Sequence, residues 1–131
     1  EAAWLDTHAD EEAHRRAFMR MWTLKEATLK ALGVGLLAPP AACGFAFPHP
    51  SRIDVSFAPR LSGCPSGATV RVALLQLSDA HQMALCRVGG DGSLFSGGTA
   101  TIRRTVPCWE EEAATARVQA CSQGGGAGPV R

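Results

Sequence analysis

The chain has 131 residues, of which 46% are hydrophobic, so we expect one globular domain with a core. Its formal net charge is +1 at pH 7 and it contains no Tyr, which argues against nucleic acid or an anionic membrane as the main partner. It contains neither an apolar run of membrane-spanning length nor a signal peptide, so we expect a cytoplasmic protein.

The first long element is a helix, predicted from about Asp10 to Leu32. Either Thr7 or Asp10 would cap its start, and its second half lacks Gly and Pro and is rich in good helix formers. Gly33 follows, a residue that often ends helices. A break near Arg15 that would give two helices stays an alternative.

One side of this helix is apolar and is predicted to face the core. At about 100° per residue it holds Phe18, Met21, Trp22, Leu29 and Leu32. Lys25 falls in the middle of this sector, and Leu24 lies well outside it. Lys25 is either a snorkelling side chain or a functional one. Glu26 and Lys30, spaced i, i+4, are either a surface pair worth about 0.3–0.5 kcal/mol or part of a site.

From Gly44 onward the pattern is that of strands. The segments with alternating apolar or β-branched residues are 44–47, 53–57, 69–77 and 82–88, with a loop predicted over 59–67. The last two strands are joined by a short turn and predict an antiparallel hairpin. We therefore predict an α+β fold in which the long helix packs on an antiparallel sheet of three or more strands.

The segments after residue 91 are harder to interpret. A strand is predicted over 100–106, and a helix over 109–120, because three successive glutamates would suit a helix N-terminus. The Gly-rich end, from residue 121 or 122 onward, is predicted to be disordered. The five cysteines are odd in number and widely spaced, without a C-x-x-C pair, so we expect free thiols in a reducing compartment.

The segment W-T-L-K-E-A-T-L-K-A-L-G-V-G-L, residues 22–36, resembles the signature of the Sfp-type 4'-phosphopantetheinyl transferases. That signature is an aromatic residue, two residues, K-E, Ala or Ser, two residues, K, and then G-x-G. The matching residues are Trp22, Lys25, Glu26, Ala27, Lys30, Gly33, Gly35 and Leu36. A weaker likeness to the family's last core strand lies in H-Q-M-A-L-C, residues 81–86.

The resemblance implies transfer of the 4'-phosphopantetheine arm of coenzyme A to a serine of an apo acyl or peptidyl carrier protein. It implies that Glu26 is a Mg²⁺ ligand that helps to activate the serine hydroxyl, which suits a metal that binds carboxylates and phosphates. It implies that Lys25 and Lys30 contact the coenzyme A phosphates, with Lys25 also counted as catalytic.

The family's first half carries a G-x-D-x-E motif that completes the metal site, and no such motif precedes Lys25. Asp54 follows Ile53, but no Gly precedes it and no Glu follows. We therefore expect residues 1–91 to be the C-terminal half domain of such an enzyme, 92–120 an extension and 121–131 a tail. An N-terminal half of the same enzyme is the expected partner. Without that half, or a homodimer in its place, the chain is expected to bind coenzyme A weakly and to turn over little or not at all.

Two alternatives stay open. A non-catalytic half domain would keep the motif by descent and bind acidic carrier proteins through Arg15, Arg16 and Arg20. An unrelated α+β domain would carry the K-E-x-x-x-K helix by chance.

Overall fold

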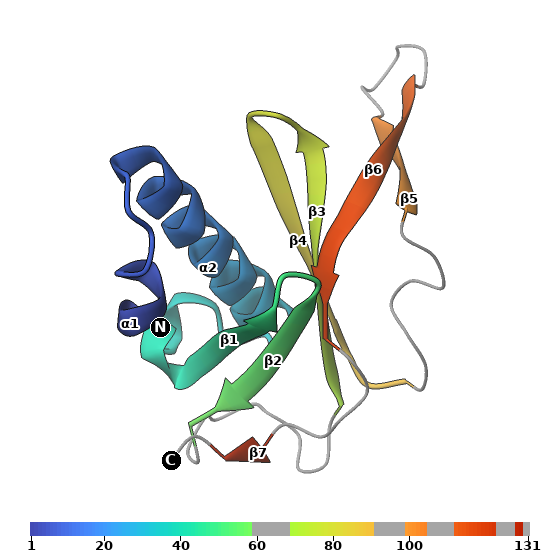
Figure 1. Cartoon of the computed structure of the whole chain (residues 1–131). Coiled ribbons are helices and arrows are strands. Elements are labelled where there is room, and N and C mark those ends of the chain that lie inside the picture. The colour runs from blue at the N-terminus through green and yellow to red at the C-terminus, as the bar shows by residue number, and fades with distance from the viewer. Residues whose placement is uncertain (59–68, 91–98, 105–111, 123–127, 130–131) are drawn as a thin grey trace.

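A computed structural model describes residues 1–58, 69–90, 99–104, 112–122 and 128–129. The helices are α1 (Ala2–Leu5), α2 (Glu11–Ala31) and the short 3-10 helices η1 (Gly35–Leu37) and η2 (Pro40–Ala42). The strands are β1 (Cys43–His49), β2 (Arg52–Phe57), β3 (Val70–Ser78), β4 (His81–Val88), β5 (Thr99–Arg104), β6 (Glu112–Cys121) and β7 (Gly128–Pro129). The fold is α+β, as predicted, with α2 lying along one side of the sheet (Figure 1).

Helix α2 begins and ends where local signals place it. The Asp10 side chain caps the start, because its Oδ1 accepts a hydrogen bond of 2.6 Å from the backbone N–H of Ala13. The helix then runs for 21 residues, so the alternative of a break near Arg15 is wrong. Gly33 follows its C-cap with φ +73°, a left-handed conformation that a residue without a Cβ adopts at no steric cost.

The buried face of α2 is rotated from the predicted one. Its buried residues are Ala17, Met21, Leu24, Lys25, Thr28 and Leu29. Leu24, predicted to lie outside the apolar face, is fully buried, whereas Phe18 and Trp22 are 47% and 41% exposed. Their rings stack instead on each other, 6.3 Å between centroids. The helix meets the sheet through small residues such as Ala17 and Thr28, which permit a closer approach than the aromatic side chains would.

This rotation predicts which truncation destabilises the protein more. Leu24→Ala is expected to lower the free energy of unfolding by about 3 kcal/mol, because it removes a fully buried side chain and leaves a cavity. Phe18→Ala is expected to cost less than about 1 kcal/mol, since that ring is half exposed and loses mainly its stacking on Trp22. Urea unfolding followed by circular dichroism measures both, and a larger loss for Phe18→Ala would contradict the observed packing.

The strands form one seven-stranded sheet in the order β1-β2-β6-β3-β4, with β5 beside β6 and β7 beside β2. The predicted hairpin is confirmed, since β3 pairs with β4 antiparallel, and β1 pairs with β2 in the same way. Strand β6 is antiparallel to β3 and parallel to β2, which it meets at the single pair Arg52–Cys121. The sheet is therefore mixed, where the sequence predicted an antiparallel one.

The strand predicted over 100–106 is found as β5, but the helix predicted over 109–120 is wrong, because residues 112–121 form β6. Two small residues of this segment, Ala116 and Ala120, are buried against opposite faces of the sheet. Partners on β3 and β5 thus override the glutamate signal for a helix start. The predicted loop over 59–67 lies outside the described residues, as do residues 123–127 and 130–131 of the predicted disordered tail. Where the tail is described, the prediction of disorder is wrong at Cys121, which ends β6, and at Gly128–Pro129, which form β7 beside β2. The domain boundaries at 91 and 120 stay predictions.

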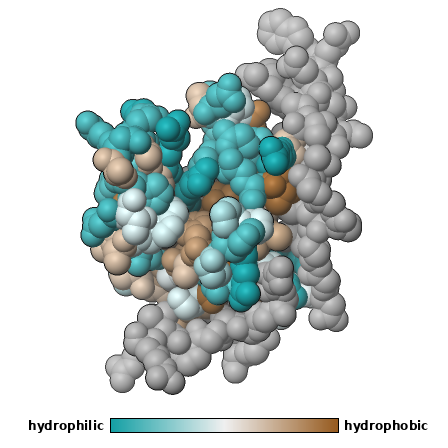
Figure 2. All heavy atoms as spheres, viewed as in Figure 1, coloured by the Kyte–Doolittle hydropathy of each residue, from teal (hydrophilic) through white to brown (hydrophobic). Residues whose placement is uncertain are grey.

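The main core lies between α2 and the sheet, and a smaller cluster around Ala73, Leu75 and Ala116 lies on the opposite sheet face. Figure 2 shows apolar residues at the centre of the face seen in Figure 1, with hydrophilic residues around them. Among the described residues, no helix is both long enough and apolar enough to cross a membrane.

Candidate functional site

Lys25 keeps its charge inside the protein and is fully engaged there. Its side chain is 9% exposed, and its Nζ donates to the carbonyl oxygens of Pro40 at 2.8 Å and Cys43 at 2.6 Å. A third partner is the Glu1 carboxylate, with Nζ–Oε2 at 2.9 Å, and the Phe45 ring centroid lies 6.0 Å away. An ammonium group has three N–H donors, and three oxygens surround this one.

These contacts tie together segments that are distant in the chain. The loop after α2 turns back through Gly33 and Gly35, both with positive φ, so that η2 and the start of β1 come beside the helix. Glu1 completes the arrangement, because its Oε1 accepts a hydrogen bond of 2.9 Å from the backbone N–H of Phe45. Lys25 and Glu1 thus hold α2, β1 and the first turn of the chain together.

Glu26 and Lys30 lie together on the outer side of α2. Lys30 Nζ is 3.7 Å from Glu26 Oε2, and the two side chains are 74% and 30% exposed, respectively. At that distance and exposure the ion pair is worth only about 0.3–0.5 kcal/mol, so both groups can exchange it for a ligand. Of the three predicted site residues, the structure brings these two together, whereas Lys25 points toward β1 and η2.

Glu26 alone does not make a magnesium site. No three His, Cys, Asp or Glu side chains gather as a metal centre among the residues that the structure describes. The one ion pair recorded for Glu26 is with a cation, Lys30. Mg²⁺ takes one or two protein carboxylates and completes its shell with water and phosphate oxygens. Among the described residues Glu26 would therefore supply one carboxylate ligand, and water, phosphate oxygens or a further carboxylate would complete the shell.

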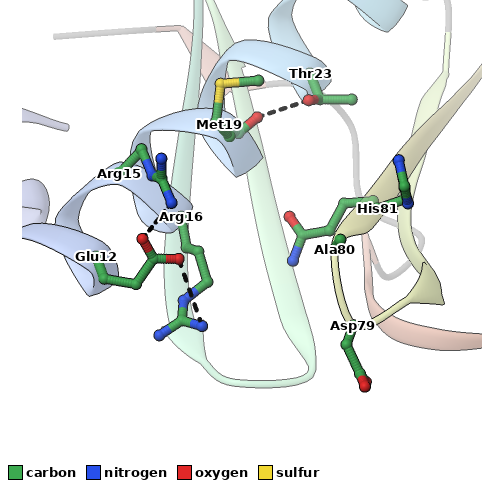
Figure 3. A pocket seen from close by; sticks show the side chains of 9 residues that line it. Glu12, Arg15, Arg16, Met19, Thr23, Asp79, Ala80 and His81 are labelled. Atoms are coloured by element: carbon green, nitrogen blue, oxygen red, sulfur yellow. Dashed lines mark hydrogen bonds and ion pairs between the residues drawn. The ribbon is translucent and has the colours of Figure 1, made fainter.

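A hollow of about 720 Å³ lies between the first half of α2 and the turn that joins β3 to β4 (Figure 3). It is lined by Glu12, Arg15, Arg16, Met19, Thr23, Asp79, Ala80, His81 and Gln82. The α2 residues that line the hollow lie on the same face of the helix as Glu26 and Lys30, because residues on one helix face recur every three or four positions. We call this face the outer stripe of α2; it holds Glu12, Arg15, Arg16, Met19, Thr23, Glu26 and Lys30. The hollow therefore opens beside that pair, further toward the N-terminus of α2.

The hollow is lined by both signs of charge. The Glu12 carboxylate pairs with Arg15 and with Arg16, and Figure 3 marks both interactions. The distance from Glu12 Oε1 to Arg16 Nη1 is 3.7 Å. On the opposite wall the His81 Nδ1 is 2.9 Å from the Ser78 hydroxyl. Guanidinium and imidazole groups beside exchangeable carboxylates suit a polar ligand with an anionic part. Sequence reasoning missed this hollow: the helical spacing contained its α2 wall, but nothing in the sequence placed the β3–β4 turn opposite.

The described cysteines, Cys43, Cys86 and Cys121, are free, as predicted for them, whereas Cys64 and Cys108 lie outside the described residues. Burial raises the pKa of the Cys43 thiol, an effect that the Lys25 charge partly opposes. Burial likewise raises the pKa of Cys86. Since the thiolate is the nucleophile, both side chains are poorly reactive in the folded protein.

Alkylation tests this burial. At pH 8 we expect iodoacetamide to modify Cys43 at least about tenfold more slowly in the native chain than in the urea-unfolded chain, because the raised pKa and the packing both suppress the thiolate. Quantifying the Cys43 peptide by mass spectrometry separates it from the other cysteines. Equal rates in the two states would show that the β1 end of the core opens readily.

Residues 1–86 match the model of a protein family described as the "4'-phosphopantetheinyl transferase superfamily". No curated protein and no solved structure matches the chain. The matched stretch contains the K-E-x-x-x-K segment of α2 and extends into β4, so the resemblance found in the sequence is confirmed and the chance-motif alternative is excluded. The chain belongs to the 4'-phosphopantetheinyl transferase superfamily.

Proposed function

We propose that this chain transfers the 4'-phosphopantetheine arm of coenzyme A to a serine of an apo acyl or peptidyl carrier protein, with Mg²⁺ and with a second half domain. Family membership supports phosphopantetheine transfer in general. The observation that carries the proposal is the accessible Glu26–Lys30 pair on the outer stripe of α2, at the motif spacing and beside a hollow of about 720 Å³.

In this reaction the serine oxygen attacks a phosphorus of the coenzyme A pyrophosphate, and the P–O bond to the leaving adenosine 3',5'-bisphosphate breaks. Glu26 is proposed to accept the serine proton and to offer one oxygen ligand to Mg²⁺. Lys30, held only by a 3.7 Å ion pair, is proposed to move onto a phosphate oxygen. Bound Mg²⁺ would neutralise charge on the pyrophosphate oxygens.

Lys25 can contact a coenzyme A phosphate only if it releases one of its present partners. Its ammonium is occupied by two carbonyl oxygens and by the Glu1 carboxylate, the only anion among the three. A coenzyme A phosphate is also an anion, so contact with Lys25 requires that the phosphate replace Glu1. The carbonyl contacts of Lys25 can persist in that exchange.

A second half domain is proposed because the family's first half carries the G-x-D-x-E motif that completes the metal site, and the described residues bring no other carboxylate to Glu26. The exposed aromatic pair Phe18–Trp22, together with the half-exposed Met19, gives α2 an apolar surface of the kind that partners cover. The reducing cytoplasm is the proposed location, in keeping with the free thiols.

The test is a transfer assay read by mass spectrometry. The full chain is incubated with Mg²⁺, coenzyme A and an apo carrier protein, alone and with a half domain that carries the G-x-D-x-E motif. We expect the phosphopantetheine mass increment on the carrier only when the second half is present. An increment at the full rate from the chain alone overturns the half-enzyme part. No increment in either mixture, with a known transferase active in parallel, overturns the transferase function.

The second candidate is the non-catalytic half domain that binds carrier proteins. It is favoured by Arg15 and Arg16, which are exposed at the mouth of the hollow and would meet an acidic carrier. It predicts that the chain binds apo carrier protein in a salt-dependent way while transfer stays absent even with the second half supplied.

A further inference from the structure

A second, smaller cavity of about 350 Å³ lies on a different side of α2 from the Glu26–Lys30 pair. It is lined by Arg20, Phe47, Pro50, Leu74, Gln76, Arg117, Val118, Gln119 and Ala120. These residues come from α2, the β1–β2 hairpin, β3 and β6, so the cavity is formed where the helix, the hairpin and the sheet meet. Among the described residues that line it, two carry guanidinium groups and none is acidic.

Arg20 is the deeper of the two cations. Its Nε is shielded from solvent and has no hydrogen-bond partner among the described residues. Leaving a charged donor buried and unpaired is costly, so native proteins almost always satisfy such groups. Arg117 is exposed and lies at the same cavity, so a ligand that enters meets a cation outside and a second one inside.

Neighbouring polar side chains do not compete for the guanidinium groups. Gln82 Nε2 lies 3.4 Å from Gln76 Oε1 and 3.4 Å from Gln119 Oε1, and Gln119 Nε2 donates to Gln76 Oε1. This cluster of three amides joins β3, β4 and β6 and fixes that wall. The remaining wall is apolar, with Phe47 and Leu74.

We propose that this cavity binds a small molecule through a phosphate or carboxylate group held by Arg20 and Arg117, with an apolar part against Phe47 and Leu74. An oxyanion accepts several hydrogen bonds from guanidinium groups and supplies the charge that the lining lacks. The cavity is within the size range of small-molecule sites. The proposal goes beyond the transfer reaction, since it uses none of Lys25, Glu26 or Lys30.

The test follows the arginine Nε–Hε signals of the full chain by NMR. Inorganic phosphate, phenyl phosphate and benzoate are titrated in turn at constant ionic strength, without coenzyme A or carrier protein. We expect a saturable shift of the Arg20 signal and tighter binding of phenyl phosphate than of inorganic phosphate, because the ring meets the apolar wall. Tighter binding of phenyl phosphate than of benzoate would identify the ligand group as a phosphate, and the reverse would identify it as a carboxylate.

Three variants decide the outcome. Arg20→Gln and Arg117→Gln are each expected to weaken the binding of phenyl phosphate about tenfold or more. Arg52→Gln, the same change on an exposed arginine of β2 that pairs with Asp54 and lines neither hollow, should leave the dissociation constant within about twofold. Shifts that do not saturate, or equal weakening by Arg52→Gln, overturn the proposal.

A separate unfolding measurement checks that the Arg20→Gln variant is folded. Arg20→Gln removes a buried Nε donor that has no partner among the described residues, so the phosphate-free variant should unfold at the same or a higher urea concentration than the parent chain. If it does not fold, Arg117→Gln at the cavity mouth still decides the proposal. Because the binding assay contains neither coenzyme A nor carrier protein, a negative result leaves the transfer proposal intact. A negative transfer assay likewise leaves the proposed anion site intact.

Discussion

Lys25→Met is expected to lower the free energy of unfolding by about 4 kcal/mol. Methionine has a similar length but no donor, so the carbonyl oxygens of Pro40 and Cys43 lose the partner that Nζ gives them. The Glu1 carboxylate loses its counter-charge at the same time. Urea unfolding followed by tryptophan fluorescence and circular dichroism measures the loss.

Lys30→Met is the matched control. It is the same substitution on the same helix, but its side chain is 74% exposed and its ion pair is long, so we expect a change below about 0.5 kcal/mol. A double-mutant cycle with Glu1→Gln then gives the part of the lost free energy of unfolding that comes from the Lys25–Glu1 ion pair. If Lys25→Met proves as stable as Lys30→Met, Lys25 is not needed for the fold, and its place in the family motif is explained by ligand binding alone.

Glu26→Gln is expected to lower the rate of phosphopantetheine transfer about 10²–10³-fold in the presence of the second half domain. Glutamine keeps the shape of the side chain but neither accepts the serine proton nor offers a charged oxygen. Because the Glu26–Lys30 pair is exposed and long, stability should stay within about 0.5 kcal/mol of the parent chain. Time courses of the mass increment on the carrier protein give the rate.

Glu11→Gln controls for the loss of a negative charge from α2. It lies in the first turn of the helix, far along the chain from the motif, and should leave the transfer rate within about twofold. If Glu26→Gln and Glu11→Gln transfer at the same rate, Glu26 has no catalytic role. A rate that falls for Glu26→Gln together with a loss of stability would point to a structural role.

The parts of the fold that could be predicted are those set by neighbours in the sequence. The Asp10 cap spans three residues, and the turn between β3 and β4 joins adjacent strands, so both are visible in the sequence. The orientation of α2 could not be predicted, because it depends on which side chains let the sheet approach, and Leu24 is buried where aromatic residues were expected. Strand β6 was missed for a similar reason, since its partners on β3 lie far away in the chain.

The same division holds for the candidate site. Glu26 and Lys30 were expected to meet because residues four apart share a helix face, and they do. The partners of Lys25 were out of reach of such reasoning, because Pro40 and Cys43 follow it by 15 and 18 residues through an irregular loop. Arg20 and Arg117 line the same cavity only because the tertiary structure brings α2 and β6 together, which the sequence does not reveal.

Strand β6 occupies the middle of the sheet although it follows β1, β2, β3 and β4 in the sequence. While the ribosome has delivered only α2 and the first four strands, the inner edges of β2 and β3 carry unpaired backbone N–H and C=O groups. Such edges recruit strands of other chains, and long-range pairing slows folding. We therefore expect the nascent protein to need protection by a chaperone until residue 121 has emerged and this strand has inserted between β2 and β3.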